Sequence, residues 1–271
     1  MNDSKMADAK KVTRAWQETL KKDGYDTPEI TAKDCKRFRK LSRAWRRILH
    51  HTGLSKTAPV SALEFGSGGG AHLVPLFVNG WNCTGIDCSN EVIARANGYV
   101  DAVRQSACAP QGSIQFVNQD FIDFIPPGEH YDLTYQFGVL EHFLNDADRL
   151  NYVQKMFDVT RVGGYVVSAV PNGGHALRRR QREEGLGGYL IPEIDYTREH
   201  LIEEMQHCGA GEVIVLAHDL FGYLKMLPIT GIKRKLLLLL YLFMQLPVFQ
   251  LLPVSVLNRH AFWWVVVAKK V

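Results

Sequence analysis

From Pro59 onward, short apolar runs alternate with longer stretches of helical periodicity, and this alternation restricts the fold more than any other feature. Parallel strands need long crossover connections, which are usually helices, so the pattern predicts an α/β fold with a parallel sheet covered on both faces. The clearest expected helices are 90–104, 146–161 and 197–208. The expected strands are 60–65, 82–87, 113–118, 131–135, 165–170, 212–217 and 262–268.

Composition adds a few limits to this picture. A hydrophobic fraction of 46% over 271 residues is ample for a core, and a net charge of +4 is too small to indicate nucleic acid by itself. The N-terminal segment is polar and shows no signal peptide. The cysteines are scattered without a CxxC pair or zinc spacing, which predicts reduced thiols in a cytosolic protein and no metal site. They are Cys35, Cys83, Cys88, Cys108 and Cys208.

Residues 1–52 are predicted to form a helical N-terminal extension that acts as a lid. Between 36 and 49, apolar residues recur at helical spacing among many lysines and arginines, which predicts a basic amphipathic helix. Gly53 then ends that helix.

Four glycines lie close together in LEFGSGGGAHL, residues 63–73, between the first expected strand and a helix. Glycines in this setting let backbone N–H groups reach a ligand at a helix N-terminus. Asp87 ends the second strand, where an acid can accept both ribose hydroxyls of a nucleoside cofactor, and Asp120 follows the third strand. The pattern therefore predicts a nucleoside-type cofactor at the carboxyl ends of the strands.

Two cofactor classes fit a glycine loop with a ribose acid. Gly66, Gly68 and Ala71 also satisfy the dinucleotide fingerprint, so an NAD(P)-dependent oxidoreductase is the alternative. However, the sequence has no Tyr-x-x-x-Lys pair, and the Glu64 carboxylate would lie near the pyrophosphate. A carboxylate at that position is better suited to a positively charged amino acid moiety.

From about residue 59 to 211 the chain resembles the class I S-adenosylmethionine-dependent methyltransferases. LEFGSGGG, CTGIDCS, FVNQDF, YDLTYQFGVLEHF and RVGGYVV resemble motifs of that family in the same order and at similar spacing. The resemblance implies a doubly wound, Rossmann-like sheet of seven mostly parallel strands with the last strand antiparallel. The methyltransferase domain is expected over 53–271. The loop at 171–197 is long and rich in glycine and charge, which predicts a lid, and the apolar run predicts an insertion at 220–260.

The resemblance further implies a cofactor site for S-adenosylmethionine. Glu64 and the glycine loop would hold the methionine end, Asp87 would accept from the ribose hydroxyls, and Cys88 would flank the adenosine. The loop residues implied are Gly66, Ser67, Gly68 and Gly70.

Beyond the third and fourth strands, the same resemblance implies the remaining cofactor contacts. Asp120 would accept from the adenine amino group, with Phe121 or Ile122 against the adenine ring. Gln136 and Phe137 would line the methionine moiety.

The segment GVLEHF places Glu141 and His142 just beyond the fourth strand, where the methyl group is expected. His142 is the preferred general base, since imidazole can take a proton at neutral pH, and Glu141 is a structural or substrate-positioning residue. The alternative is that His142 only supports the backbone. In the lid loop, the substrate contacts expected are His175, Arg178 and Tyr196.

The acceptor is less determined than the cofactor. No Asn/Asp-Pro-Pro-aromatic tetrad follows the fourth strand and no cysteine is placed for cytosine methylation, so no nucleic-acid partner is expected. O-methylation of a small-molecule or lipid-linked acceptor is favoured. An RNA methyltransferase and a non-catalytic methyltransferase-like interaction module remain as alternatives.

Residues 236–257 contain no charged side chain and follow the basic run Lys233-Arg234-Lys235. Pro247 and Pro253 divide the run into pieces too short to span a bilayer. The sequence therefore predicts peripheral membrane contact through 232–257 and 36–49, at the inner face of the membrane of a cytoplasmic protein. The alternative is a helical hairpin that packs on its own domain or on a second copy.

Overall fold

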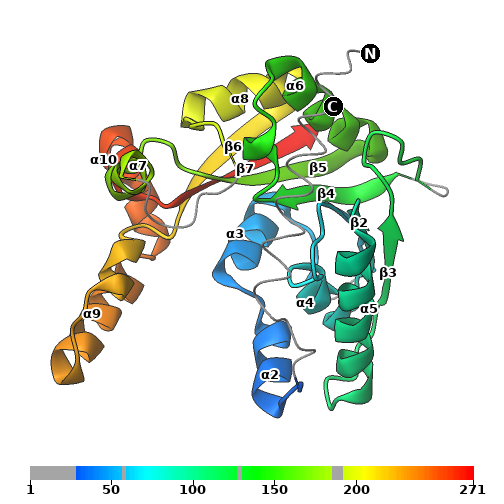
Figure 1. The fold of residues 1–271 in the computed structure, drawn as a ribbon, viewed down its shortest axis with the longest axis horizontal. Coiled ribbons are helices and arrows are strands. Elements are labelled where there is room, and N and C mark those ends of the chain that lie inside the picture. The colour runs from blue at the N-terminus through cyan, green and yellow to red at the C-terminus, as the bar shows by residue number, and fades with distance from the viewer. Residues whose placement is uncertain (1–28, 57–58, 127–129, 185–191) are drawn as a thin grey trace.

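The computed structural model describes residues 29–56, 59–126, 130–184 and 192–271. Their centre is one sheet of seven strands in the order β3-β2-β1-β4-β5-β7-β6 (Figure 1). The strands are β1 (Ser61–Phe65), β2 (Asn82–Asp87), β3 (Ser113–Asn118), β4 (Tyr131–Phe137), β5 (Thr160–Pro171), β6 (Ala210–His218) and β7 (Trp263–Lys270). All seven predicted strands are confirmed, β2 and β3 with their predicted ends.

The strand directions also follow the prediction. β1 pairs with β2 and β4 in parallel, and β4 pairs with β5 in parallel. β7 lies between β5 and β6 and is antiparallel to both. The fold is therefore the expected doubly wound, Rossmann-like sheet with its last strand antiparallel.

Helices cover both faces of the sheet (Figure 1). Alternate strand residues point to opposite faces, so Ala62 and Leu63 of β1 belong to different buried clusters. One cluster includes residues of α2 (Ala32–Lys40), α3 (Arg43–Thr52), α4 (Leu73–Val78) and α5 (Asn90–Gln105). The other includes residues of α6 (Asp146–Val159), α8 (Arg198–His207) and α10 (Val254–His260).

Of the helical extension predicted at 1–52, residues 1–28 lie outside the described residues, and the single basic helix predicted at 36–49 is divided between α2 and α3. The helix is interrupted between α2 and α3, where Leu41 has a φ of 60°. The Ser42 hydroxyl then caps α3 by accepting from Trp45 N at 3.2 Å. Gly53 ends α3 as predicted, in the left-handed conformation. The apolar side chains of this region are buried in the protein core, so 36–49 cannot insert an apolar face into a bilayer. They include Phe38, Leu41, Trp45 and Ile48.

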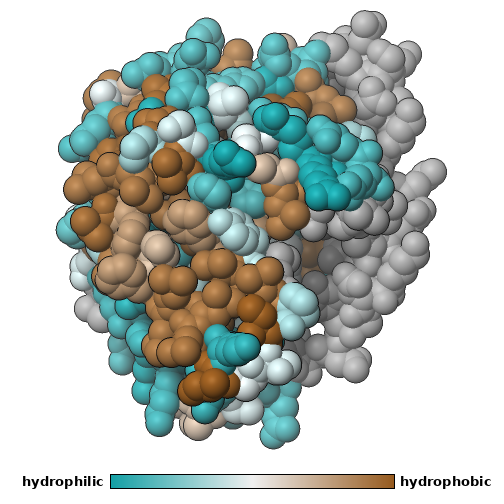
Figure 2. All heavy atoms as spheres, turned by 90° about the vertical axis from the view of Figure 1, so that its left-hand side faces the viewer, coloured by the Kyte–Doolittle hydropathy of each residue, from teal (hydrophilic) through white to brown (hydrophobic). Residues whose placement is uncertain are grey.

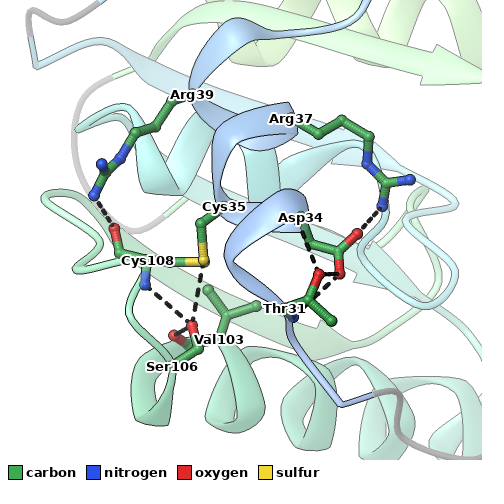
Figure 3. Close-up of a disulfide and its surroundings, with 8 residues drawn as sticks. All are labelled: Thr31, Asp34, Cys35, Arg37, Arg39, Val103, Ser106 and Cys108. Atoms are coloured by element: carbon green, nitrogen blue, oxygen red, sulfur yellow. Dashed lines mark hydrogen bonds and ion pairs between the residues drawn. A yellow bond between two sulfur atoms is a disulfide. The ribbon is translucent and has the colours of Figure 1, made fainter.

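A disulfide joins Cys35 of α2 to Cys108 in the loop after α5 (Figure 3). Their Cα atoms lie 4.9 Å apart although 73 positions separate them in the chain. The Arg39 side chain donates to the Cys108 carbonyl oxygen at 2.8 Å, which adds a second link between these segments. This pairing corrects the prediction of five reduced thiols, because packing of α2 on the domain brings together two cysteines with no recognisable spacing.

The apolar insertion consists of short helices, as its prolines predict. α9 (Gly231–Phe243) ends before Pro247, a 3₁₀ turn, η3, covers Pro247–Leu251, and α10 begins after Pro253. Within the described ranges, no helix has both the length and the apolar character needed to cross a membrane.

Candidate active site

The candidate site lies at the carboxyl ends of β1 and β4, where the sheet order reverses. The connections of β1 and β4 lead away in opposite directions there, and ligands of open α/β sheets bind at such a point. The loops that follow β1 and β4 are in close contact, because a Cβ added to Gly66 would lie 2.5 Å from Val139 Cγ2. Gly66 also has a φ of 67°, which favours glycine.

The glycine loop is hydrogen-bonded to the end of β2 and has open space beside Gly68 and Gly69. Gly68 N donates to Asp87 Oδ2 at 3.1 Å, which ties the loop to the end of β2. A Cβ added to Gly68 or Gly69 would meet no atom within 4 Å. The Ser67 hydroxyl is buried, and no hydrogen bond is formed to its oxygen within the described chain. The loop thus offers space and a polar atom to a ligand.

Asp87 is held by backbone donors at the end of β2. Besides the bond from Gly68, Ser89 N donates to Asp87 Oδ1 at 3.0 Å. Burial raises the pKa of Asp87, while the N–H donors act in the opposite direction. Each carboxylate oxygen can accept more than one hydrogen bond, so the group can still receive a hydroxyl.

Glu64 is fully enclosed within the sheet. Its Oε2 accepts a hydrogen bond of 3.3 Å from the Tyr135 hydroxyl on β4, and both side chains are buried. Burial raises the pKa of Glu64 well above its usual value. A cationic ligand group beside it would favour the ionised form.

The segment after β3 places its two predicted residues differently. Asp120 is exposed, and its Oδ1 accepts from Ile122 N at 3.0 Å in a local turn. The Phe121 ring packs edge-on against Tyr152, with ring centroids 4.3 Å apart. Cys88 is exposed at the end of β2. Asp120 and Cys88 are therefore at the protein surface, whereas Phe121 packs against an aromatic side chain of α6.

Gln136 and Phe137 finish β4 and support the turn that follows. Gln136 is fully buried, and its Oε1 accepts from Val139 N at 2.8 Å while its Nε2 donates to the Ser168 hydroxyl. The Phe137 ring lies edge-on to His72, with centroids 4.6 Å apart. Gln136 thus fixes the backbone that carries the catalytic candidates.

Those candidates lie in the 3₁₀ turn η1 (Leu140–His142). His142 Nδ1 lies 3.0 Å from the Pro192 carbonyl oxygen, and only Nδ1–H can donate in this pair, so Nε2 carries the lone pair of the neutral ring. Burial lowers the pKa of His142. Glu141 is buried, its Oε2 has no hydrogen-bond partner in the described chain, and burial raises its pKa to about 8.

A family model described as a methyltransferase domain matches residues 36–209, which is more than half of the chain. The chain belongs to this family. It is a class I methyltransferase, and its cofactor is S-adenosylmethionine. The alternative of an NAD(P)-dependent oxidoreductase is thereby set aside.

Solved structures of methyltransferases share the fold at low sequence identity. An S-adenosylmethionine-dependent methyltransferase from Methanosarcina mazei has 14% identity and a TM-score of 0.55, with 85% of this chain and 98% of that chain covered. One from Archaeoglobus fulgidus has 15% identity, a TM-score of 0.56 and coverages of 86% and 96%. The magnesium protoporphyrin IX methyltransferase from Synechocystis, solved with bound S-adenosylhomocysteine, has 11% identity, a TM-score of 0.55 and full coverage of both chains. A comparison with curated protein sequences finds no match.

Of the lid loop predicted at 171–197, residues 185–191 lie outside the described residues. On either side of them, Arg178 and Glu193 lie near η1. Arg178 of α7 (Ala176–Glu183) forms an ion pair with Glu193, and both side chains are largely buried. Possible ligand atoms of Glu141, His142 and Glu193 all lie within 4.8 Å of one another. The Arg178 guanidinium already neutralises Glu193, and Glu141 is protonated near neutral pH, so this cluster suits proton handling better than cation binding.

The structure places two other predicted substrate residues inside the domain. Tyr196 is fully buried, and its hydroxyl donates to Glu204 Oε2 at 2.8 Å, so it contributes to the core on the α8 side of the sheet. His175 is also buried, and its ring lies against Phe262 with centroids 4.2 Å apart. Of the three substrate candidates, Arg178 alone is brought to the catalytic turn through a contact described here.

Sequence reasoning missed two residues that shape the site. Val139 fills the space left by Gly66, and the Trp263 ring comes within 3.8 Å of a Cβ added to Gly138. Both are apolar side chains whose position depends on contacts between distant strands. No local sequence signal marks them.

Proposed function

We propose that this methyltransferase transfers a methyl group from S-adenosylmethionine to an oxygen atom of a small-molecule or lipid-linked acceptor at a membrane surface. The observation that carries the proposal is the orientation of His142. With Nδ1–H bound to the Pro192 carbonyl, Nε2 is the atom that can take a proton from a hydroxyl. A neutral imidazole whose Nε2 carries the lone pair can accept the proton of a hydroxyl acceptor during O-methylation.

Different residues of the site bind different parts of S-adenosylmethionine. The open backbone of Gly68 and Gly69 and the unpartnered Ser67 hydroxyl receive the methionine end, with Glu64 beneath. Asp87 receives the ribose hydroxyls. When bound, S-adenosylmethionine supplies the electrophilic methyl carbon, and the protein's task is alignment and proton removal.

The adenine end has less enclosure. Asp120 accepts from the adenine amino group, and Cys88 flanks the adenosine at the same exposed edge. Phe121 or Ile122 packs against the adenine ring: Phe121 contacts the Tyr152 ring, and Ile122 is 39% exposed. Phe137 borders the methionine moiety.

Glu141 orients the acceptor beside the base. Its carboxyl group is protonated near neutral pH, and its unpartnered oxygen is buried next to His142. A protonated carboxyl can donate to an acceptor oxygen, or accept from a hydroxyl through its carbonyl oxygen. The ion pair of Arg178 with Glu193 closes the lid side of the same turn.

Untargeted mass spectrometry tests the proposal. The purified protein is incubated with S-adenosylmethionine and with lipid and metabolite extracts, and products that gain the mass of one methylene group are sought. Fragmentation then shows whether the new methyl group is on oxygen. A methylated product on nitrogen or carbon, or in RNA alone, would contradict the proposed acceptor class.

A further inference from the structure

α9 is attached to the domain by polar groups near its C-terminal end. The hydroxyl of Tyr241, the one buried residue of α9, donates to Asp219 Oδ1 at 2.5 Å, and in the turn after the helix Gln245 Nε2 donates to the Leu220 carbonyl at 2.6 Å. Arg47 of α3 donates to the Gln245 carbonyl at 2.9 Å. In a helix that folds only for its own domain, apolar side chains would occupy these inward positions.

The outward side of the insertion is apolar instead. Figure 2 shows the face of the molecule that carries α9 and α10, with a broad apolar area on it. We call residues 231–254 the apolar arm. Its exposed large side chains include Ile232, Leu236, Leu239, Leu240, Leu242, Phe243, Leu246, Val248, Leu251 and Val254, with Leu251 at 84%. Monomeric soluble proteins rarely expose so many neighbouring apolar side chains without a partner.

Charge identifies the partner. Residues 220–271 contain seven lysines and arginines and no aspartate or glutamate, whereas the whole chain has 32 basic and 28 acidic residues. Lys233, Arg234 and Lys235 are all exposed on α9 beside the leucines. Asp219, which accepts from Tyr241, is already paired with Lys225 at 2.8 Å. An apolar surface that carries an exposed basic run complements the acyl chains and headgroups of an anionic bilayer. A second copy would bring the same basic run, without an acid on the arm to pair with it.

The dimensions determine how deep the arm can go. α9 has 13 residues, about 20 Å of helix, whereas the hydrocarbon core of a bilayer is about 30 Å thick. The C-terminal end of α9 is also held to the domain through Tyr241 and Gln245. The helix is thus suited to lie in one leaflet, parallel to the surface.

The arm is coupled to the catalytic turn through α10. Asn172 at the end of β5 donates from Nδ2 to the carbonyl oxygens of Asn258 and Ala261, at 2.7 and 2.8 Å. The chain then continues directly into Trp263, which lies against Gly138 before η1. The arm is therefore linked to the site through α10, Asn172 and Trp263.

We propose that the apolar arm inserts into one leaflet of an anionic phospholipid bilayer and that the acceptor is an amphiphile taken from that leaflet. The acceptor class rests on the proposed function, whereas the insertion itself does not. Insertion places the edge of the sheet that carries His142 close to the headgroups.

Vesicle flotation tests the insertion without reference to activity. The probes are vesicles of phosphatidylcholine alone and of phosphatidylcholine with phosphatidylglycerol. The full chain should float with the anionic vesicles and bind the neutral ones far more weakly. Replacing Lys233, Arg234 and Lys235 by Gln should weaken anionic binding by roughly a hundredfold, at the usual contribution of each basic residue near such a surface.

A pair of matched double variants separates the arm from general surface hydrophobicity. Leu239→Ser with Leu251→Ser removes side chains that are 62% and 84% exposed, and should reduce vesicle binding by roughly a hundredfold. Ile125→Ser with Val162→Ser removes side chains that are 80% and 71% exposed elsewhere, and should leave binding unchanged. Both variants should keep the melting temperature and cofactor affinity of the parent protein, which shows that they fold.

Several outcomes would overturn the insertion. They are no flotation of the full chain, equal loss in both double variants, or a stable dimer in solution that ignores vesicles and dissociates when the arm is changed. Vesicle binding without any methyl transfer would overturn the proposed function and leave the insertion standing. Methyl transfer to oxygen of a water-soluble acceptor by a protein that ignores vesicles would overturn the insertion, the amphiphilic acceptor and the membrane-surface part of the proposed function, and would leave O-methylation standing.

Discussion

The Tyr135 hydroxyl donates a hydrogen bond of 3.3 Å to Glu64, and the sheet encloses both side chains completely. A carboxylate in this position is costly for the free protein and useful for a ligand with a cationic amino group. Because its pKa lies well above 4.5 in the fold, the folded protein keeps a proton that the unfolded chain releases as pH rises. Stability of the free protein should therefore decrease from about pH 4.5 upward through the raised pKa.

Glu64→Gln tests this relationship in both directions. The free variant should melt at a higher temperature than the parent protein, with a small difference at pH 5 and a larger one at pH 8. Its affinity for S-adenosylmethionine should fall by roughly tenfold to a hundredfold, the usual loss for a charge-assisted hydrogen bond. A melting-temperature difference that does not change with pH would show that Glu64 does not carry the raised pKa.

Asp87→Ala should weaken S-adenosylmethionine binding by about tenfold to a hundredfold, because the ribose loses a charge-assisted acceptor. It also releases Gly68 N from its hydrogen bond, so the glycine loop loses an anchor. Calorimetry measures the affinity, and circular dichroism controls for the fold. Unchanged affinity would contradict the assignment of Asp87 to the ribose.

The pH profile of methyl transfer should have an acidic limb that belongs to His142. Burial lowers the pKa of His142 below 6.5, so the neutral, proton-accepting ring persists at neutral pH and is lost only at a lower pH. His142→Ala should reduce kcat by roughly 10² to 10⁴-fold with little change in cofactor affinity, and should remove this limb. A loss below about fivefold would leave His142 with a structural role only.

Glu141 should govern the alkaline side of the same profile. Burial raises its pKa to about 8, so the carboxyl group loses its proton as pH increases through that value. Glu141→Gln keeps a neutral side chain and should remove the change in kcat/KM near pH 8 while the acidic limb remains. If the alkaline limb persists in the variant, another group is responsible for it.

The disulfide between Cys35 and Cys108 should stabilise the domain by constraining the unfolded chain. A separation of 73 residues corresponds to roughly 4 kcal/mol by chain entropy, or a melting-temperature change on the order of 10 °C for a domain of this size. The double variant Cys35→Ser with Cys108→Ser should show this loss and no further response to reductant. An unchanged melting temperature of the parent protein under reducing conditions would contradict the link.

The sheet could be predicted from sequence because strand periodicity and the glycine loop are local signals. The segments at 82–87 and 113–118 have their predicted ends, since apolar runs and flanking polar residues mark them. The break of the N-terminal helix at Leu41 was not predicted, because apolar side chains on both sides of it keep a helical spacing. Its position depends on how α2 and α3 each pack against the sheet.

The lid side of the site was harder to predict for the same reason. The sequence around Arg178 indicates no ion-pair partner for it, but in the structure it pairs with Glu193, 15 residues further along the chain. Tyr196 resembles a loop tyrosine, yet Glu204 of α8 binds its hydroxyl in the core. Both partners are set by tertiary contacts, which no spacing rule contains.

The roles of Asp87 and His142 can be separated by measuring methyl transfer over a range of S-adenosylmethionine concentrations. The proteins compared are the parent protein, Asp87→Ala and His142→Ala. Asp87→Ala should recover its rate at high cofactor concentration, because it loses cofactor affinity but keeps the base. His142→Ala should remain roughly 10² to 10⁴-fold slower than the parent protein at every S-adenosylmethionine concentration, because it loses the base. Recovery of the His142→Ala rate at high cofactor concentration would contradict the role of His142 as the base. Binding of S-adenosylmethionine by the parent protein without transfer to any acceptor would contradict the proposed methyl transfer.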